Sequence, residues 1–139
     1  MSATARPQRI RLRQQGRVLE LHHESEVQTL EAEYLRVSSP SAEMRGHGAD
    51  GSGAVLPVGK KHVRIAKLEP AGHYALRLYF SDGHDSGLYT WAYLHRLGAE
   101  KPHRWQQYLA KLQAAGAARD PEVQAVRLLD LGDVDLKGP

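Results

Sequence analysis

Cysteine is absent from this 139-residue sequence. Its absence excludes disulfides, thiol catalysis and any zinc or iron–sulfur site that relies on thiolates from this chain alone. A metal ion would need histidine and carboxylate ligands instead. Long hydrophobic runs are also absent, since no apolar stretch approaches the roughly 18 residues that span a bilayer. Residues 1–7 lack the apolar core of a signal peptide, so we expect a cytoplasmic protein with no membrane partner.

The positive charge of the chain is modest, with a formal net charge of +3 and an isoelectric point near 9.3. Part of it comes from Arg9, Arg11 and Arg13, which alternate with Ile10 and Leu12 and therefore share one face of a predicted strand. A nucleic-acid-binding surface would combine several basic elements with exposed aromatic side chains. Only this one basic element stands out, so we interpret it as a solvated strand face. A nucleic-acid partner is not expected.

The length fits a single domain. The mean hydropathy of −0.53 indicates that part of the chain is solvated. We expect residues 1–7 to be a disordered leader and residues 8–116 to form the domain. Residues 117–139 are predicted to be a C-terminal tail that either forms a short extra element or remains loose.

Alternating apolar and polar residues predict most of the secondary structure as antiparallel strands. The expected strands are 10–12, 18–21, 62–69, 73–80 and a short one near 88–91, with turns at 14–16, 70–72 and 82–83. Tyr74, Leu76, Leu78 and Phe80 should share one face of the clearest strand. Residues 46–59 are rich in Gly, Ala and Ser and predict a loop.

Helical spacing appears in three places. Val27, Leu30, Tyr34 and Leu35 predict a short helix within residues 25–37, with Thr29 capping its second half. A helical turn over 91–97 should be closed by Gly98, and residues 102–115 form the clearest helix, with Gly116 as its C-cap. The chain is thus predicted to be α+β: a small, mainly antiparallel β module with one or two short helices packed on the sheet and a C-terminal helix.

The turn after the clearest strand carries the most informative side chain. His84 lies there between Asp82 and Asp85, and a carboxylate beside an imidazole can fix its tautomer or help it to hold a metal ion. The aromatic residues gather later in the sequence, at Tyr89, Trp91, Tyr93, Trp105 and Tyr108. Most of them should lie in the core, whereas two exposed ones beside Arg36 and Arg45 would form a partner-binding face.

Three separated motifs occur in order: Tyr34-Leu35-Arg36, the stretch from Ser38 to Glu43, and the stretch from Phe80 to Trp91. Together they resemble the DUF971 family, which is similar to the N-terminal domain of gamma-butyrobetaine hydroxylase. The resemblance covers roughly residues 8–100. It implies a compact α+β module that carries no oxygenase chemistry, because the iron and 2-oxoglutarate site of the hydroxylases lies in a separate domain. Similar modules also occur fused to P-loop ATPases of the iron–sulfur carrier type.

The resemblance further implies a metal site: in the hydroxylases this module holds zinc through three cysteines and one histidine. The histidine position resembles His84, while Ser38, Ser39 and Ser41 stand near the expected thiolate positions. Neutral hydroxyls are poor zinc ligands, so we expect the family's zinc site to be absent here. His84 would instead hydrogen-bond the loop of residues 38–41 and hold it in place.

We therefore expect a stand-alone, non-catalytic accessory module that acts through a protein partner, with the iron–sulfur carrier ATPases as the candidate class. In this reading no cofactor is needed, and Arg36, Ser38, Ser41, Asp82, Tyr89 and Trp91 have structural or interaction roles. The alternative is a metal-binding protein in which His84, His47 and Glu43 hold zinc or iron. A small enzyme is less favoured, and a homo-oligomer stays open.

Overall fold

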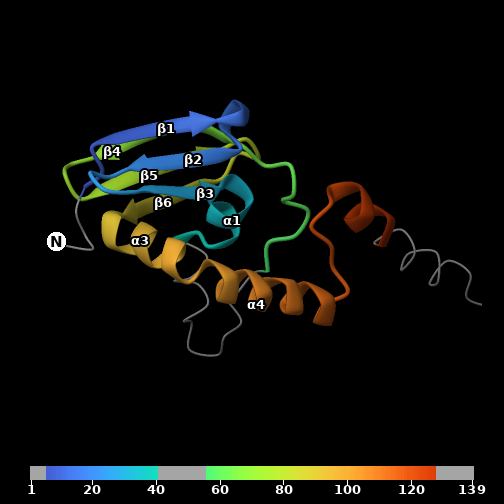
Figure 1. The fold of residues 1–139 in the computed structure, drawn as a ribbon. Helices are drawn as coiled ribbons and strands as arrows, with labels where there is room; N and C mark the ends of the chain where they lie inside the picture. The colour runs from blue at the N-terminus through green and yellow to red at the C-terminus, as the bar shows by residue number, and fades with distance from the viewer. Residues whose placement is uncertain (1–5, 41–55, 128–139) are drawn as a thin grey trace, which may run out of the picture.

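Two three-stranded antiparallel sheets form the body of the protein in a computed structural model that describes residues 6–40 and 56–127. The first sheet has the order β1-β2-β3 and the second the order β4-β5-β6. Their bounds are β1 Arg9–Arg13, β2 Val18–His22, β3 Val27–Glu31, β4 Ile65–Ala71, β5 Ala75–Phe80 and β6 Asp85–Thr90. The helices are α1 Ala32–Val37, α3 Trp91–Ala99 and α4 Lys101–Ala114, and residues 121–127 are also helical. Figure 1 shows α3 and α4 running along one side of the sheets. The predicted α+β class is confirmed.

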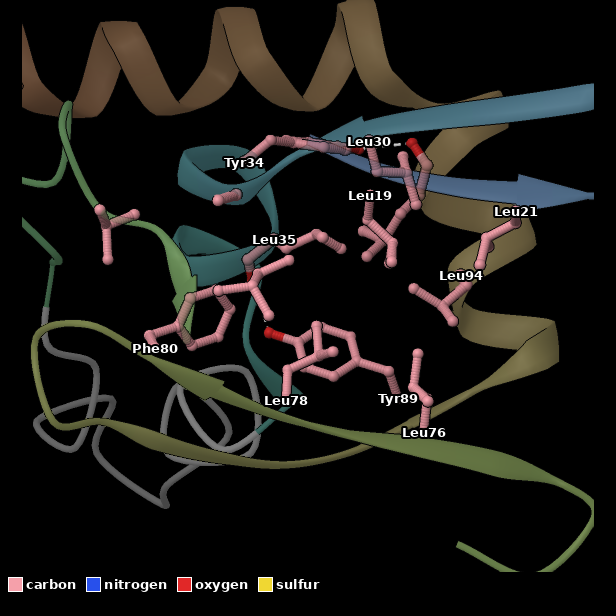
Figure 2. Packing of buried hydrophobic residues seen from close by; sticks show 14 of the residues in the cluster. Leu19, Leu21, Leu30, Tyr34, Leu35, Leu76, Leu78, Phe80, Tyr89 and Leu94 are labelled. Carbon is pink, nitrogen blue, oxygen red and sulfur yellow. Dashed lines mark hydrogen bonds between the residues drawn. The ribbon is translucent and has the colours of Figure 1, made fainter. Parts of the chain in front are cut away.

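The hydrophobic core lies between the two sheets and is closed by α1 and α3. Leu19, Leu21 and Leu30 of the first sheet face Leu76 and Leu78 of the second, and none of these five side chains is more than 2% exposed (Figure 2). This burial follows from strand alternation, because residues two apart point to the same face. The same alternation leaves Arg9, Arg11 and Arg13 exposed on β1, as a solvated strand face requires.

The predicted hairpin between β1 and β2 is present, and its turn residues Gln14, Gln15 and Gly16 all have positive φ. Gly16 has φ +90°, and a Cβ built there would lie 2.4 Å from the carbonyl oxygen of Ile65. Only glycine therefore fits at this point, where the turn meets the first residue of β4.

The predicted helix over residues 25–37 is wrong in its first half. Val27–Glu31 form β3, in which Leu30 pairs with Leu19 of β2, and Thr29 is a strand residue rather than a cap. The helix begins only at Ala32 and ends at Val37. A strand that ends with an inward leucine and runs directly into a helix places apolar residues at helical spacing, so periodicity alone could not separate the two.

In the second sheet, β4 begins and ends later than predicted, whereas β6 begins earlier, at Asp85, and ends at Thr90 instead of reaching residue 91. β4 begins at Ile65 and continues through Pro70 and Ala71, which were expected in the turn. Proline is tolerated there because β4 is an edge strand, and the turn follows at Gly72 with φ +60°. Tyr74, expected on the buried face, precedes β5 and is 59% exposed.

Gly98 does not end its helix. α3 begins at the N-cap Thr90, whose side chain accepts a hydrogen bond from the Tyr93 backbone N–H, and it continues through Gly98 to Ala99. The side chain of Gln28 occupies the space that a Cβ on Gly98 would need. The glycine thus permits close packing of α3 on β3. Within the parts of the chain described here, no helix is long and apolar enough to cross a membrane.

Candidate functional site

The turn between β5 and β6 carries the side chains that the sequence singles out. Gly83, with φ +85°, donates its backbone N–H to the carbonyl of Phe80, and the Phe80 N–H donates to the carbonyl of His84. The Asp82 carboxylate accepts a hydrogen bond from the His84 backbone N–H at 3.1 Å. An aspartate that bonds the backbone two residues ahead stabilises a tight turn, and here it also sets the direction in which His84 leaves the strand.

Asp82 joins this turn to two other segments. One of its oxygens accepts hydrogen bonds from Arg36 Nε at the end of α1, at 2.8 Å, and from Lys60 Nζ at 2.7 Å. The three side chains are only 12–22% exposed. Partial burial by itself raises the pKa of Asp82, but the hydrogen bonds from Lys60, the His84 backbone and Arg36 outweigh burial and hold the pKa at about 2. Asp82 is therefore ionised at neutral pH and acts as a cross-link between three segments.

His84 lies against the chain that follows α1. Its Nε2 is 3.3 Å from the hydroxyl oxygen of Ser39, a residue that is completely buried. The neighbouring carbonyl of Ser38 accepts a hydrogen bond from the Tyr93 hydroxyl at 2.6 Å. The serines and the histidine are thus close in space although 45 residues separate Ser39 from His84 in the sequence. These polar contacts connect the chain that follows α1 to the β5–β6 turn and to Tyr93.

Tyr89 and Trp91 are both buried. Tyr89 is 0% exposed, and its hydroxyl donates to the carbonyl of Leu35 at 2.6 Å (Figure 2). Trp91 is 6% exposed, and its Nε1 donates to the carbonyl of His73 at 2.7 Å. These two aromatic side chains face the interior, so neither supplies an exposed aromatic surface beside Arg36.

The predicted metal ligands are only partly within the described residues. His84 is placed, whereas the other two, Glu43 and His47, lie outside those residues, as do Ser41 and Arg45, for which structural or interaction roles were predicted. In 6–40 and 56–127, no group of three or more His, Asp or Glu side chains could hold a metal ion. The donors recorded near His84 are the Ser39 hydroxyl and an Asp82 carboxylate that already binds two cations. This donor set does not fit a closed tetrahedral zinc site, which needs nitrogen, thiolate or free carboxylate ligands.

A second cross-link was missed by the sequence analysis. Arg119 forms a two-bond ion pair with Glu33 of α1, at 2.7 Å for both bonds, and its guanidinium lies 5.2 Å from the centre of the Trp105 ring. The backbone N–H groups of Gly59 and Lys61 donate to the carbonyls of residues 118 and 119. Residues 117–120 are thereby attached to the domain. Because the two charged residues are 86 positions apart, no local signal could have indicated the pair.

Comparison with known proteins agrees with this fold and arrangement. The family model described as "gamma-butyrobetaine hydroxylase-like, N-terminal" matches residues 10–95, more than half of the chain. The chain belongs to this family. The match includes both sheets, α1 and the turn with His84, whereas α4 and the segment that carries Arg119 lie beyond it.

Solved structures show the same fold at substantial sequence identity. Two solution NMR structures are 47% and 43% identical, each with a TM-score of 0.71, and they cover 85% and 87% of this chain and 92% and 89% of their own. A crystal structure of a DUF971-family protein of unknown function from Acidithiobacillus ferrooxidans is 37% identical with a TM-score of 0.57, covering 72% of this chain and all of its own. No curated protein matches. These similarities describe a small accessory domain.

Proposed function

We propose that this domain is a non-catalytic binding module that acts through a protein partner. The observation that supports the proposal is how the polar residues of the β5–β6 turn are used. Asp82 binds Arg36 and Lys60, and His84 lies against Ser39, so the polar side chains of this turn connect the second sheet to α1 and the chain that follows it. They stabilise a surface rather than present a reactive group.

The partner that family resemblance favours is a protein of the iron–sulfur carrier ATPase type, because similar modules are fused to such ATPases. This module would then contact an ATPase of the same kind. A rigid scaffold lowers the entropic cost of association, and the two cross-links at Asp82 and Glu33 contribute to such a scaffold.

Cross-linking in cells tests the proposal. The full chain, carrying an affinity tag and expressed at its natural level, is cross-linked, purified and analysed by quantitative mass spectrometry. We expect one or a few proteins to be recovered in near-stoichiometric amounts, with an ATPase among them. Recovery of the chain alone under all growth conditions would contradict a partner-binding role. Sedimentation of the purified chain measures self-association separately.

The alternative is a metal-binding protein in which His84 acts with His47 and Glu43. The observation that favours it is the direction of His84, whose ring contacts Ser39 just before the segment that contains the other two residues. Elemental analysis of the untagged protein, dialysed without chelator, distinguishes the two functions. About one zinc or iron per chain, lost in His84→Ala, supports the alternative; a metal-free protein that keeps its partner supports the binding module.

A further inference from the structure

A groove of about 490 Å³ lies between α4 and the chain that follows it. Leu109, Leu112 and Gln113 of α4 form one wall, and residues 116–120 together with Val123 and Arg127 form the other. Lys61 also lines the groove. Figure 1 shows how the chain leaves the end of α4, turns back toward residues 56–64 and continues into the short helix of residues 121–127.

The second wall is held in place by several independent contacts. The Arg119–Glu33 ion pair and the backbone hydrogen bonds from Gly59 and Lys61 attach its first part to the domain. Asp120 accepts a hydrogen bond from the Glu122 backbone N–H at 2.8 Å and so begins the short helix. The side chain of Gln124 then accepts a hydrogen bond from the Ala118 N–H at 2.7 Å. The groove is therefore preformed, which lowers the entropic cost of binding.

Apolar side chains remain exposed in and beside this groove. Val123 is 43% exposed, and Val126, one helical turn further on, is 54% exposed. They are two of the five large hydrophobic residues that the described chain exposes, and both belong to a helix of seven described residues. Val123 and Leu109 give the groove an apolar floor over Leu112, which is only 4% exposed, and Val126 lies beside the groove. Clustered exposed apolar side chains are typical of an interaction surface.

The charges around this floor are mostly positive. Three cations line the groove, Lys61, Arg119 and Arg127, against a single carboxylate, that of Asp120. The charge of Arg119 is balanced by Glu33, and hydrogen bonds from backbone N–H groups lower the pKa of Asp120. Lys61 and Arg127 are both exposed, so they offer positive charge at the rim of an apolar floor.

We propose that this groove binds an acidic, amphipathic peptide segment of the partner protein. The inference rests on the proposed function and names the chemistry of the partner. Apolar side chains of such a segment would cover Leu109 and Val123, and its carboxylates would meet Lys61 and Arg127. No aromatic side chain is among the residues that line the groove, so it offers no stacking platform for nucleic-acid bases.

Peptide selection on the full chain tests this proposal. Random displayed peptides of about 12 residues, long enough for an amphipathic helix, are selected on the wild-type protein and counter-selected on Val123→Glu. Affinities of the enriched peptides are then measured by fluorescence anisotropy at about 50 and about 200 mM salt. Lys61→Glu tests the rim. Lys111→Glu on α4 and Val27→Glu on β3 are matched controls, since both residues are exposed and neither lines the groove.

We expect the enriched peptides to combine Asp or Glu with apolar residues at helical spacing. Val123→Glu and Lys61→Glu should each weaken binding about tenfold or more, the controls should change it less than about twofold, and higher salt should weaken it. The proposal is overturned if no peptide is enriched, if the enriched peptides lack acidic residues, or if both groove variants bind like the wild type. If both groove variants still bind a cellular partner, the groove is not its binding site, but the proposal that the domain binds a partner still holds. If the wild-type chain recovers no partner protein in cells, the proposed function itself is rejected.

Discussion

Replacing Asp82 by asparagine tests the central cross-link of the candidate site. Asparagine keeps the size of the side chain and an oxygen that can accept the hydrogen bond from His84, so the substitution removes mainly the negative charge between Arg36 and Lys60. The pKa of Asp82 is lowered from 3.8 to about 2. At about 1.4 kcal/mol per pKa unit, this shift corresponds to about 2.5 kcal/mol, and solvent screening of these partly exposed charges reduces the contribution to about 2 kcal/mol of folding free energy at neutral pH.

The stabilisation by Asp82 should depend on pH in a defined way. Because the folded-state pKa lies below the unfolded value, the contribution is fully present above about pH 4 and is lost as the pH falls toward 2. The free energy of unfolding of Asp82→Asn should therefore be about 2 kcal/mol below that of the wild type at pH 7. At pH 3 the difference should shrink to about 1 kcal/mol.

Urea unfolding followed by tryptophan fluorescence measures both differences, since Trp91 and Trp105 lie in or against the core. Glu24→Gln is the control: Glu24 is an exposed carboxylate, and its substitution should change stability by less than about 0.5 kcal/mol. The reasoning fails if Asp82→Asn is as stable as the wild type at pH 7. It also fails if the loss is equally large at pH 3, because the cause would then not be the charge.

Three further substitutions test other parts of the structure, each by its free energy of unfolding in urea. Gly16→Ala should lower the free energy of unfolding by about 2 kcal/mol or more beyond the effect of Gly83→Ala. Both glycines have positive φ, but only a Cβ at position 16 would collide with the backbone of β4. Equal losses would argue against the close contact. Arg119→Ala leaves the nearly buried Glu33 without its ion-pair partner, so it should cost about 2 kcal/mol and lower the amide-exchange protection of residues 59–61. Unchanged protection would mean that residues 117–120 are not attached there. His84→Ala should cost about 1–3 kcal/mol through loss of the contact with the buried serine hydroxyl, and an unchanged melting temperature would exclude a structural role for this histidine.

Local patterns were sufficient for the elements whose neighbours in sequence decide their conformation. The alternation of Leu76, Leu78 and Phe80 identified β5, and the pair Asp82-Gly83 identified the turn that follows it. The spacing in residues 102–115 identified α4 to within one residue at each end. In these segments the spacing of apolar side chains and the turn residues favour the same conformation as the tertiary packing, so local patterns predict it correctly.

Other features depended on contacts that local patterns do not contain. Residues 27–31 form a strand because β2 offers Leu19 as a partner for Leu30, although their spacing is equally compatible with a helix. Gly98 lies inside α3 because β3 places Gln28 against it. In both cases packing between distant segments overrode a weak local signal.

The sequence by itself determined the family, the class of fold and the consequence of having no cysteine, namely that thiolate zinc binding is impossible for this chain. Only the tertiary structure decided which charges meet: Asp82 with Arg36 and Lys60, and Glu33 with Arg119. The physical reason is distance along the chain. The Asp82 contacts join residues 22 and 46 positions apart and the Glu33 contact joins residues 86 apart, so each pair exists only after the sheets and helices have packed.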